Sequence, residues 1–293
     1  MAPTTVAVCG TLVADIRVRP FDPVDAARHG DLRDVDEVRL AVGGLVGNTG
    51  MALARLGVST AALGRLGDDP IGDVMAAELV RAGVLTNSLT REPNTLTSTV
   101  LVCVDGAGER TFHVAPGVNP LFGADDLERE WRLLTGANAV LLGYLGLLPR
   151  LDPRLPALLA RLRRDTTALL VLETAGPQRK TRALLDQCLP FLDIFFPSWS
   201  EARDLTGAHQ PIDALADLAR VPGPGILGIK LGSAGCLVRT EQGTVSVPTT
   251  PVDAVDATGA GDVFLAGLVA ALLSGCDAPT ACAAGNRAAA LAV

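Results

Sequence analysis

Short apolar runs alternate with amphipathic stretches along the chain beyond Pro120. The runs typical of buried strands lie near residues 138–143, 168–172, 192–196 and 226–231. The stretches around them have apolar residues at helical spacing, near residues 125–135, 154–164, 179–188, 199–206 and 211–220. Strands that alternate with helices in this way predict an α/β fold, with a mostly parallel sheet that helices cover on both faces.

The N-terminal part of the chain begins with the same alternation. Val6–Cys9 is a short apolar run that ends at a glycine, as expected of a buried first strand. Residues 46–56 have the pattern of a helix, and residues 59–66 have that of a strand. A further helix is predicted at 70–82, because Asp69 is a suitable N-cap and a proline follows it directly.

Two segments depart from this alternation. Residues 11–42 and 97–114 switch loosely between apolar and polar side chains, and each contains two extended pieces. We therefore expect them to form a small β-sheet that lies over one edge of the core as a lid. At the other end of the chain, two Ala-rich helices are predicted at 259–274 and 277–292, and their apolar character on most faces predicts that both are well buried.

Composition and charge exclude several functions. Of the 293 residues, 48% are hydrophobic, so the chain can bury a large core. The net charge of −7 and the lack of a dense basic run argue against binding to nucleic acid. The apolar runs are too short to span a membrane, and the N-terminus lacks the pattern of a signal peptide. The six cysteines are scattered, which is typical of reduced thiols in a cytoplasmic protein.

The strongest local signal for chemistry is the stretch DATGAGDVF at residues 256–264. Gly259 and Gly261 flank Ala260 at the start of a long apolar helix, where backbone N–H groups and the helix dipole favour an anion. Asp262 could accept the proton of a hydroxyl group that attacks a phosphoryl group. Alternatively, Asp262 only stabilises the first turn and the glycines only permit tight packing. The spacing matches neither a dinucleotide fingerprint nor a P-loop.

Two further stretches occur in the N-terminal part. GGLVGNTGMALARLG at 43–57 places two glycines before a helix that carries an asparagine, and GTLVAD at 10–15 follows the first strand. Together with DATGAGDVF, these stretches resemble the signatures of the PfkB/ribokinase family of carbohydrate and nucleoside kinases. The resemblance extends over essentially the whole chain. It implies a ribokinase-like three-layer α/β/α core, formed by a single kinase domain of residues 1–293, with the small β-sheet as its lid.

The resemblance also implies roles for individual residues. Asp262 would be the catalytic base, and the anion hole would be formed by Gly259, Ala260 and Gly261. The residues that would contact substrate hydroxyl groups are Asp15, Gly43, Gly44 and Asn48. Charged or amide groups beside an approachable backbone suit a polyol. Without the family, Asp15 could be a turn residue after the first strand, and Asn48 could be a helix cap.

Other positions match the nucleotide side of the family's site. These positions are Ser198, Glu201, Lys230, Gly232, Gly235 and Asn286. Glu201 would help to place Mg²⁺ and the phosphates of ATP, through water, whereas Ser198 replaces a family asparagine and would mainly cap a helix. Lys230 and Asn286 could instead be solvated. Some members of the family bind a monovalent cation such as K⁺ beside the anion hole, and Asp256 and Thr258 match part of its shell.

The predicted enzyme is an ATP-dependent carbohydrate kinase that acts on a sugar or sugar-like small molecule. The alternatives are a nucleoside kinase of the same family and a catalytically weak regulatory protein that binds a ligand. Residues 142–146 lack the acidic residue that many sugar-specific members carry there, so ribose is not specifically indicated. Exposed lid strands can pair between subunits, which predicts a homodimer through the lid.

Overall fold

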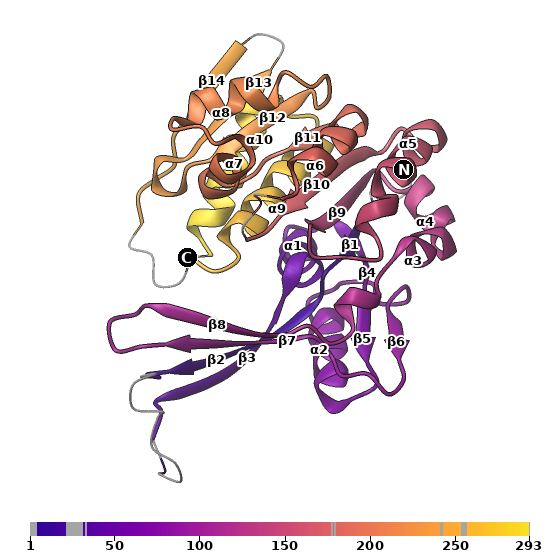
Figure 1. Cartoon of the computed structure of the whole chain (residues 1–293), viewed down its shortest axis with the longest axis vertical. Coiled ribbons are helices and arrows are strands. Elements are labelled where there is room, and N and C mark those ends of the chain that lie inside the picture. The colour runs from indigo at the N-terminus through magenta and orange to yellow at the C-terminus, as the bar shows by residue number, and fades with distance from the viewer. Residues whose placement is uncertain are drawn as a thin grey trace.

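Eight strands form one continuous sheet through the middle of the molecule (Figure 1). In spatial order the strands are β14 (Gly243–Val247), β13 (Cys236–Thr240), β12 (Ile226–Lys230), β11 (Ile194–Phe195), β10 (Leu169–Thr174), β9 (Ala139–Leu145), β1 (Thr5–Gly10) and β4 (Ser59–Leu63). All are parallel except β13 and β14, which add an antiparallel edge. The computed structural model describes residues 5–21, 32, 34–176, 178, 180–240, 243–252 and 257–292.

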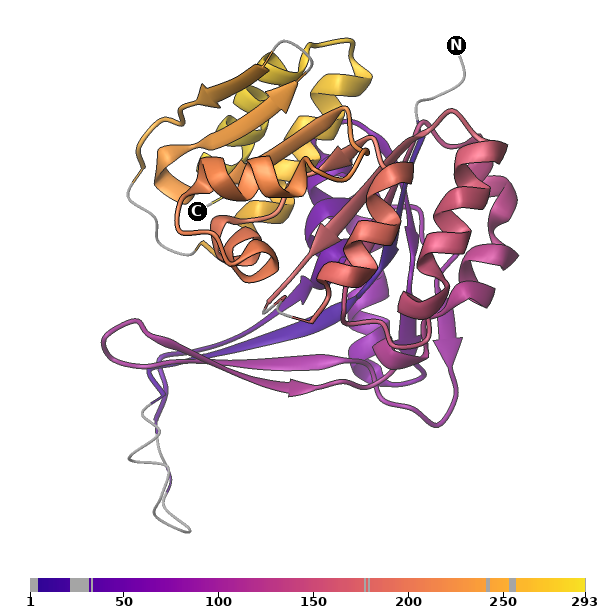
Figure 2. The same ribbon diagram turned by 45° about the horizontal axis from the view of Figure 1, so that its top comes forward.

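Helices cover both faces of this sheet, which confirms the predicted three-layer α/β/α core (Figure 2). One face carries α3 (Ala124–Arg129), α4 (Trp131–Gly136), α5 (Leu155–Asp165), α6 (Arg182–Cys188), α7 (Trp199–Thr206) and α8 (Pro211–Leu218). The other carries α1 (Gly44–Arg55), α2 (Pro70–Arg81), α9 (Ala260–Leu273) and α10 (Ala278–Ala290). Successive side chains of β9 alternate between the two layers, so an uninterrupted apolar run is what a strand buried on both faces requires.

A second, smaller sheet stands apart from the large one and projects below it in Figures 1 and 2. Its strands, in spatial order, are β3 (Glu37–Gly43), β2 (Val13–Arg19), β7 (Thr99–Val104) and β8 (Arg110–Ala115). This arrangement confirms that the segments 11–42 and 97–114 form a sheet of their own. Part of the first segment, residues 22–31 and 33, lies outside the described residues.

Asp69 fastens the small sheet to the core. It is the predicted N-cap of α2 and accepts a hydrogen bond from the N–H group of Gly72 at 2.7 Å. The same carboxylate accepts from the N–H and hydroxyl groups of Thr97, at 2.6 and 2.7 Å. Burial acts to raise the pKa of Asp69, but these hydrogen bonds hold it below its usual value. Because Thr97 is engaged with the start of a helix, the lid strand begins at Thr99 rather than at 97.

Two predicted elements are broken in the structure. The strand predicted at 59–66 ends at Leu63, and Arg65 begins β5 (Arg65–Gly67), which pairs with β6 (Thr90–Glu92). The charged side chain of Arg65 cannot continue in an apolar sheet, and it pairs instead with Asp126 at 3.0 Å. The helix predicted at 125–135 is divided into α3 and α4 by the non-helical backbone of Glu130.

The last two helices differ in burial. Helix α9 packs between α1 and α10, and Leu265, Ala266 and Leu268 are fully buried, as predicted. Helix α10 buries four residues, among them Cys282 and Asn286, and most of its other residues are half-buried, so it is less buried than predicted. Alanine is small enough to be half-exposed at little cost, so Ala richness alone does not predict burial. Among the described residues, no helix combines the length and the apolar character that a membrane span requires.

Candidate active site

Asp262 lies in the first turn of α9, but its side chain does not cap that helix. The carboxylate is buried and accepts hydrogen bonds from other parts of the fold. The amide of Asn48, from α1, donates to Oδ2 at 2.9 Å, and the hydroxyl group of Tyr144, from the end of β9, lies 2.8 Å from both Oδ1 and Oδ2. These contacts argue against a purely local role for Asp262 in stabilising the first turn.

The surroundings of Asp262 set its proton affinity. Burial raises the pKa of this carboxyl above its ordinary value, since the charged form loses its contact with water. The hydrogen bonds from Asn48 and Tyr144 and the positive charge of Lys230 act in the opposite direction. The carboxylate is therefore more basic than an exposed aspartate, a property that suits a general base.

The glycine-containing turn before Asp262 begins α9. Gly259 is the N-cap residue and adopts the left-handed conformation, with φ of 76°, which glycine tolerates without strain. The N–H group of Ala260 turns back to the carbonyl group of Ala257 at 3.2 Å. The anion-binding potential of the turn therefore rests on the N–H groups of Gly261 and the residue after it, which belong to a helix start.

Lys230 reaches this helix start from the end of β12. A Cβ atom placed on Gly261 would lie 3.2 Å from the Nζ atom of Lys230, so the ammonium group lies directly against that glycine. The side chain is only 12% exposed and forms an ion pair with Glu173 of β10. The alternative that Lys230 is solvated is therefore wrong. The side chain is directed inward because the buried carboxylate of Glu173, two strands away in the sheet, attracts it.

Glu173 and Lys230 affect each other's protonation. Burial raises the pKa of Glu173 from an ordinary 4.5 to about 8, and the charge of Lys230 offsets only part of that effect. Burial acts to lower the pKa of Lys230, but the nearby carboxylates of Glu173 and Glu201 raise it above its usual value. Burial and the ion pair therefore act on the pKa of Glu173 in opposite directions, and Lys230 keeps its ammonium charge at the start of α9.

Ser198 and Glu201 form the predicted capping box at the start of α7. Glu201 Oε2 accepts from the N–H group of Ser198 at 2.8 Å, and Ser198 Oγ accepts from the N–H group of Glu201 at 3.3 Å. Glu201 is nine-tenths buried, and its charge acts on both Lys230 and Glu173. The cap therefore also holds a carboxylate beside the lysine.

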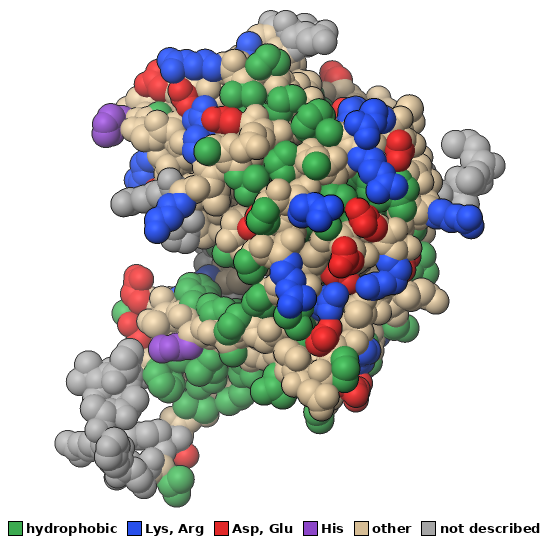
Figure 3. Space-filling model, turned by 45° about the vertical axis from the view of Figure 1, so that its right-hand side comes forward, with side chains coloured by type: hydrophobic (Ala, Val, Ile, Leu, Met, Phe, Trp, Pro, Cys, Tyr) green, Lys and Arg blue, Asp and Glu red, His purple; other side chains and the backbone are tan. Residues whose placement is uncertain are grey.

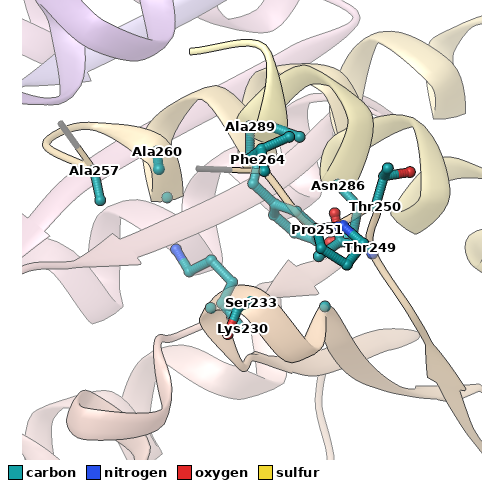
Figure 4. Close-up of a pocket in the computed structure, with 15 residues that line it drawn as sticks. Lys230, Ser233, Thr249, Thr250, Pro251, Ala257, Ala260, Phe264, Asn286 and Ala289 are labelled. Carbon is teal, nitrogen blue, oxygen red and sulfur yellow. The ribbon is translucent and has the colours of Figure 1, made fainter. Parts of the chain in front are cut away.

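A cavity of about 200 Å³ adjoins Lys230 and the start of α9 (Figure 4). Its lining includes the predicted nucleotide-side residues Lys230, Gly232, Gly235 and Asn286, together with Gly261, Phe264 and residues 249–252. In Figure 4 the amine of Lys230 extends toward the turn that carries Ala257 and Ala260, while Phe264 and Pro251 line the other end. The cavity thus combines an apolar part with a cationic end.

Asn286 shapes one wall of this cavity. Its side-chain amide donates to the carbonyl groups of Val247 and Pro248, at 3.0 and 3.2 Å. The side chain is 6% exposed, so the alternative that it is solvated on the surface of α10 is wrong. By holding the chain after β14, Asn286 positions the residues at 249–252 that line the cavity.

The predicted acceptor-side residues lie together at the start of α1. The carboxylate of Asp15, from β2, is so close to Gly43 that a Cβ atom on that residue would lie 2.0 Å from Oδ2. A larger residue at position 43 would therefore displace the carboxylate of Asp15. Asn48 lies within α1, whose N-cap is Gly43, so Asn48 is not a helix cap, and Asp15 lies within a strand rather than in a turn. Helix α1 carries Gly44 and Asn48 and so links Asp15 to Asp262.

Two residues of this cluster were missed at the level of the sequence. Tyr144 lies in the segment 142–146, whose pattern indicates only the lack of an acidic residue, and no motif includes Glu173. The only sequence signal for both is that a polar residue ends an apolar strand run, which places it at the carboxyl edge of a parallel sheet. Of the two residues predicted for a monovalent cation, Thr258 accepts a hydrogen bond from Arg110 at 2.7 Å, and Asp256 lies outside the described residues.

Comparison with known proteins gives consistent matches. Residues 4–293 match the model of the pfkB family of carbohydrate kinases. The chain is 31% identical to a fructokinase from Klebsiella pneumoniae over 78% of this chain and 76% of the relative. It is 26% identical to a ribokinase from Haemophilus influenzae, over 99% and 92%. The structure of an Arabidopsis thaliana ribokinase complexed with ribose and ATP aligns with a TM-score of 0.81 at 25% identity, over 99% of this chain and 92% of that one.

Proposed function

The chain belongs to the pfkB family of carbohydrate kinases, and we propose that its site transfers the γ-phosphoryl group of ATP to a hydroxyl group of a sugar, with Asp262 as the base. The observation that supports these roles best lies at the start of α9. There, a buried carboxylate and a buried ammonium group flank one glycine, since Asp262 follows Gly261 and Lys230 lies against it. Phosphoryl transfer to an alcohol needs both a proton acceptor and positive charge at such a point.

The chain's own residues account for the movement of charge and protons. The acceptor hydroxyl group attacks the γ-phosphorus, and its proton passes to the carboxylate of Asp262 as the new O–P bond forms. The bond to the leaving β-phosphate oxygen breaks, and ADP is released. The N–H group of Gly261 and the ammonium group of Lys230 stabilise the negative charge on the transferred group. Both are in place beforehand, so little reorganisation is required.

Acceptor binding is assigned to residues on the other side of Asp262. Asp15, beside Gly43 and Gly44, offers a carboxylate to sugar hydroxyl groups. Asn48 donates to the base through its amide nitrogen, which leaves its carbonyl oxygen as an acceptor for a substrate hydroxyl group. A polyol requires several acceptors of this kind.

The nucleotide is assigned to the cavity between α9, α10 and β12. Its apolar lining, walled by Asn286, suits a purine base, and its cationic end suits phosphates. Two carboxylates here could help to hold Mg²⁺, because Oε2 of Glu173 is buried with no hydrogen-bond partner among the described residues and the carboxylate of Glu201 lies nearby. When bound, Mg²⁺ would neutralise phosphate charge, and Glu201 would hold it through water. Thr258 and Asp256 remain the candidates for K⁺.

Glu201→Gln is expected to raise the Mg²⁺ concentration needed for half-maximal activity by about 10- to 100-fold, the usual effect of removing a group that holds a metal's water ligands. Glutamine can still accept from the N–H group of Ser198, so the fold should be retained. Activity is measured against Mg²⁺ concentration at saturating substrates.

Ser198→Ala serves as the control, since it removes the cap but keeps the carboxylate of Glu201. It should lower the free energy of unfolding by about 1 kcal/mol. An unchanged Mg²⁺ dependence for Glu201→Gln would reduce Glu201 to a helix cap.

The small sheet is assigned the role of a lid. Figure 3 shows a hollow between this sheet and the main body, and Arg110 of β8 crosses to Thr258 beside the anion-binding turn. Closure over the acceptor would exclude water from the transfer.

Hydrophobic side chains gather over the small sheet (Figure 3), and Val38 and Leu40 of β3 are 66% and 41% exposed. We assign this apolar surface to a homodimer, and a monomer in sedimentation at micromolar concentration would contradict that assignment.

The cytoplasm is the proposed location. All six cysteines belong to the described residues, and each is a free thiol, as expected of a reducing compartment in which ATP is available.

Turnover of ATP against a panel of sugars, sugar phosphates, sugar acids and nucleosides tests the proposed function. We expect phosphorylation of one or more sugars and a new phosphate ester in the product. Turnover with nucleosides alone would make the chain a nucleoside kinase of the same family. Binding of a panel member without phosphorylation would support the regulatory alternative, in which the fold is kept without catalysis.

A further inference from the structure

Tyr144 is the single tyrosine of the chain, and the reaction described above gives it no part. It lies near the carboxyl end of β9, which is flanked by β10 and β1 in the middle of the large sheet. Its ring packs against the buried residues beneath α1 and α9. A central strand therefore presents a phenol to the proposed base, and neighbouring strands on both sides hold that strand in place.

The hydrogen bond from Tyr144 is shared between the two carboxylate oxygens of Asp262. The phenol oxygen lies 2.8 Å from each of them, although a phenol has only one proton to donate. Such a shared contact fixes the plane of the carboxylate relative to β9. Asn48 takes one further acceptor position, on Oδ2, and Thr49 approaches Oδ1 only at 3.4 Å. A carboxylate accepts about four hydrogen bonds, so room remains for the hydroxyl group of an acceptor.

We propose that Tyr144 is a positioning residue, which holds the carboxylate of Asp262 in the orientation and the ionised form that proton abstraction requires. The proposal rests on the function proposed above, since it assumes that Asp262 is the base. It does not require the phenol to touch either substrate.

The charged groups around Asp262 show why this donor matters. Lys230, from β12, stabilises the carboxylate of Asp262. The same ammonium group is also attracted by the carboxylates of Glu173, from β10, and Glu201, from α7. The carboxylate of Glu173 disfavours a second negative charge nearby. Helix α1 supplies only uncharged donors. A buried carboxylate in such a place tends to take up a proton, and the hydrogen bond from the phenol opposes that tendency.

A different role for Tyr144 can be distinguished from this one. The phenol could occupy the place of the acceptor hydroxyl group in the free enzyme and leave when substrate binds. Removing its hydroxyl group would then improve acceptor affinity and leave kcat unchanged. A positioning residue behaves in the opposite way, because its loss impairs kcat and changes the pH at which the base becomes active.

The test compares Tyr144→Phe with a protein in which the single tyrosine is replaced by 3-fluorotyrosine through biosynthetic labelling. The rise of kcat/KM with pH reports ionisation of the base. This rise is the acidic limb of the pH profile. In Tyr144→Phe we expect the limb to move upward by about one pH unit. At pH values below the limb, kcat/KM should be roughly tenfold lower, with little change in KM. Fluorine makes the phenol a stronger donor, so the limb of the labelled protein should move to lower pH. An unmoved limb in both proteins, or a lower KM with normal kcat in Tyr144→Phe, would overturn the proposal.

The fluorine nucleus also provides a readout that does not depend on activity. Its single resonance should shift as Asp262 titrates, and this titration should disappear in Asp262→Asn. A titrating resonance in a protein that phosphorylates no member of the panel would refute the kinase function and the positioning role with it. A resonance that does not titrate, in an active kinase, would refute the positioning role alone.

Discussion

Replacing Asp262 with asparagine is expected to lower turnover by roughly 10²–10⁴-fold, the usual effect of losing a positioned base. An alcohol is a weak nucleophile until its proton is removed, and the amide of asparagine cannot accept that proton near neutral pH. The carbonyl oxygen of the new side chain can still accept from Asn48 and Tyr144. Turnover is measured at saturating ATP and acceptor, and affinity for ATP should change little.

The Asp262→Asn protein should also remain folded. Burial raises the pKa of this carboxyl, so its ionised form opposes folding above the ordinary pKa, and a neutral side chain removes that cost. Asp15→Asn is a matched control, because it makes the same chemical change on the acceptor side and should raise KM more than it lowers kcat. Near-normal turnover in a folded Asp262→Asn protein would contradict the role of the base. Unfolding of that variant would instead indicate that Asp262 mainly anchors the start of α9.

Replacing Lys230 with methionine is expected to lower turnover by roughly 10²–10³-fold, the cost of removing one donor from a preorganised anion site. Methionine has a similar length and fits the same buried space, but it brings no positive charge to the start of α9. Backbone N–H groups alone would then face the transferred phosphoryl group. Single-turnover rates would separate this loss from any weakening of ATP binding.

The same substitution should change how stability depends on pH. The pKa of Glu173 rises from 4.5 in the unfolded chain to about 8 in the folded protein, so the folded state binds more protons between these values. The contribution of Glu173 to the free energy of unfolding therefore falls as the pH rises through that range. Loss of Lys230 raises the pKa of Glu173 further, so Lys230→Met should lose more stability at pH 8 than at pH 5.

A second substitution separates the two effects of losing Lys230. Adding Glu173→Gln to Lys230→Met removes the titrating group, so urea unfolding should show the stability at pH 8 restored while turnover stays low. Equal loss of stability at pH 5 and pH 8 in the single variant would show that Glu173 is not the partner that matters. Nearly normal turnover in the single variant would place Lys230 away from the transferred group.

Much of the fold was predictable because the signals for it are local. The strand at β9 and the helix at α2 depend on neighbouring residues alone: an apolar run in one case, and an Asp-Pro start in the other. The errors arose where a distant contact overrode the local pattern. The strand at 59–66 ends early because Arg65 is drawn to Asp126, 61 residues away.

The candidate site was predictable to a lesser degree. The turn at 259–261 and the capping box at Ser198 could be found because each is contained within a few residues. The surroundings of Asn48 could not, since its contact with Asp262 joins residues 214 positions apart. Its isolated place in a helix was equally consistent with a cap.

The sequence by itself determined the α/β alternation, the separate small sheet, the family and the turn that begins α9, because each is encoded in short stretches or in their order. Only the tertiary structure decided which side chains meet. Lys230 and Glu173 are 57 residues apart and Tyr144 and Asp262 are 118 apart, and no local pattern marks either pair. They meet because parallel strands all end at one edge of the sheet, where α9 also begins. Burial at that edge then shifts the pKa values of these side chains, which no local sequence pattern predicts.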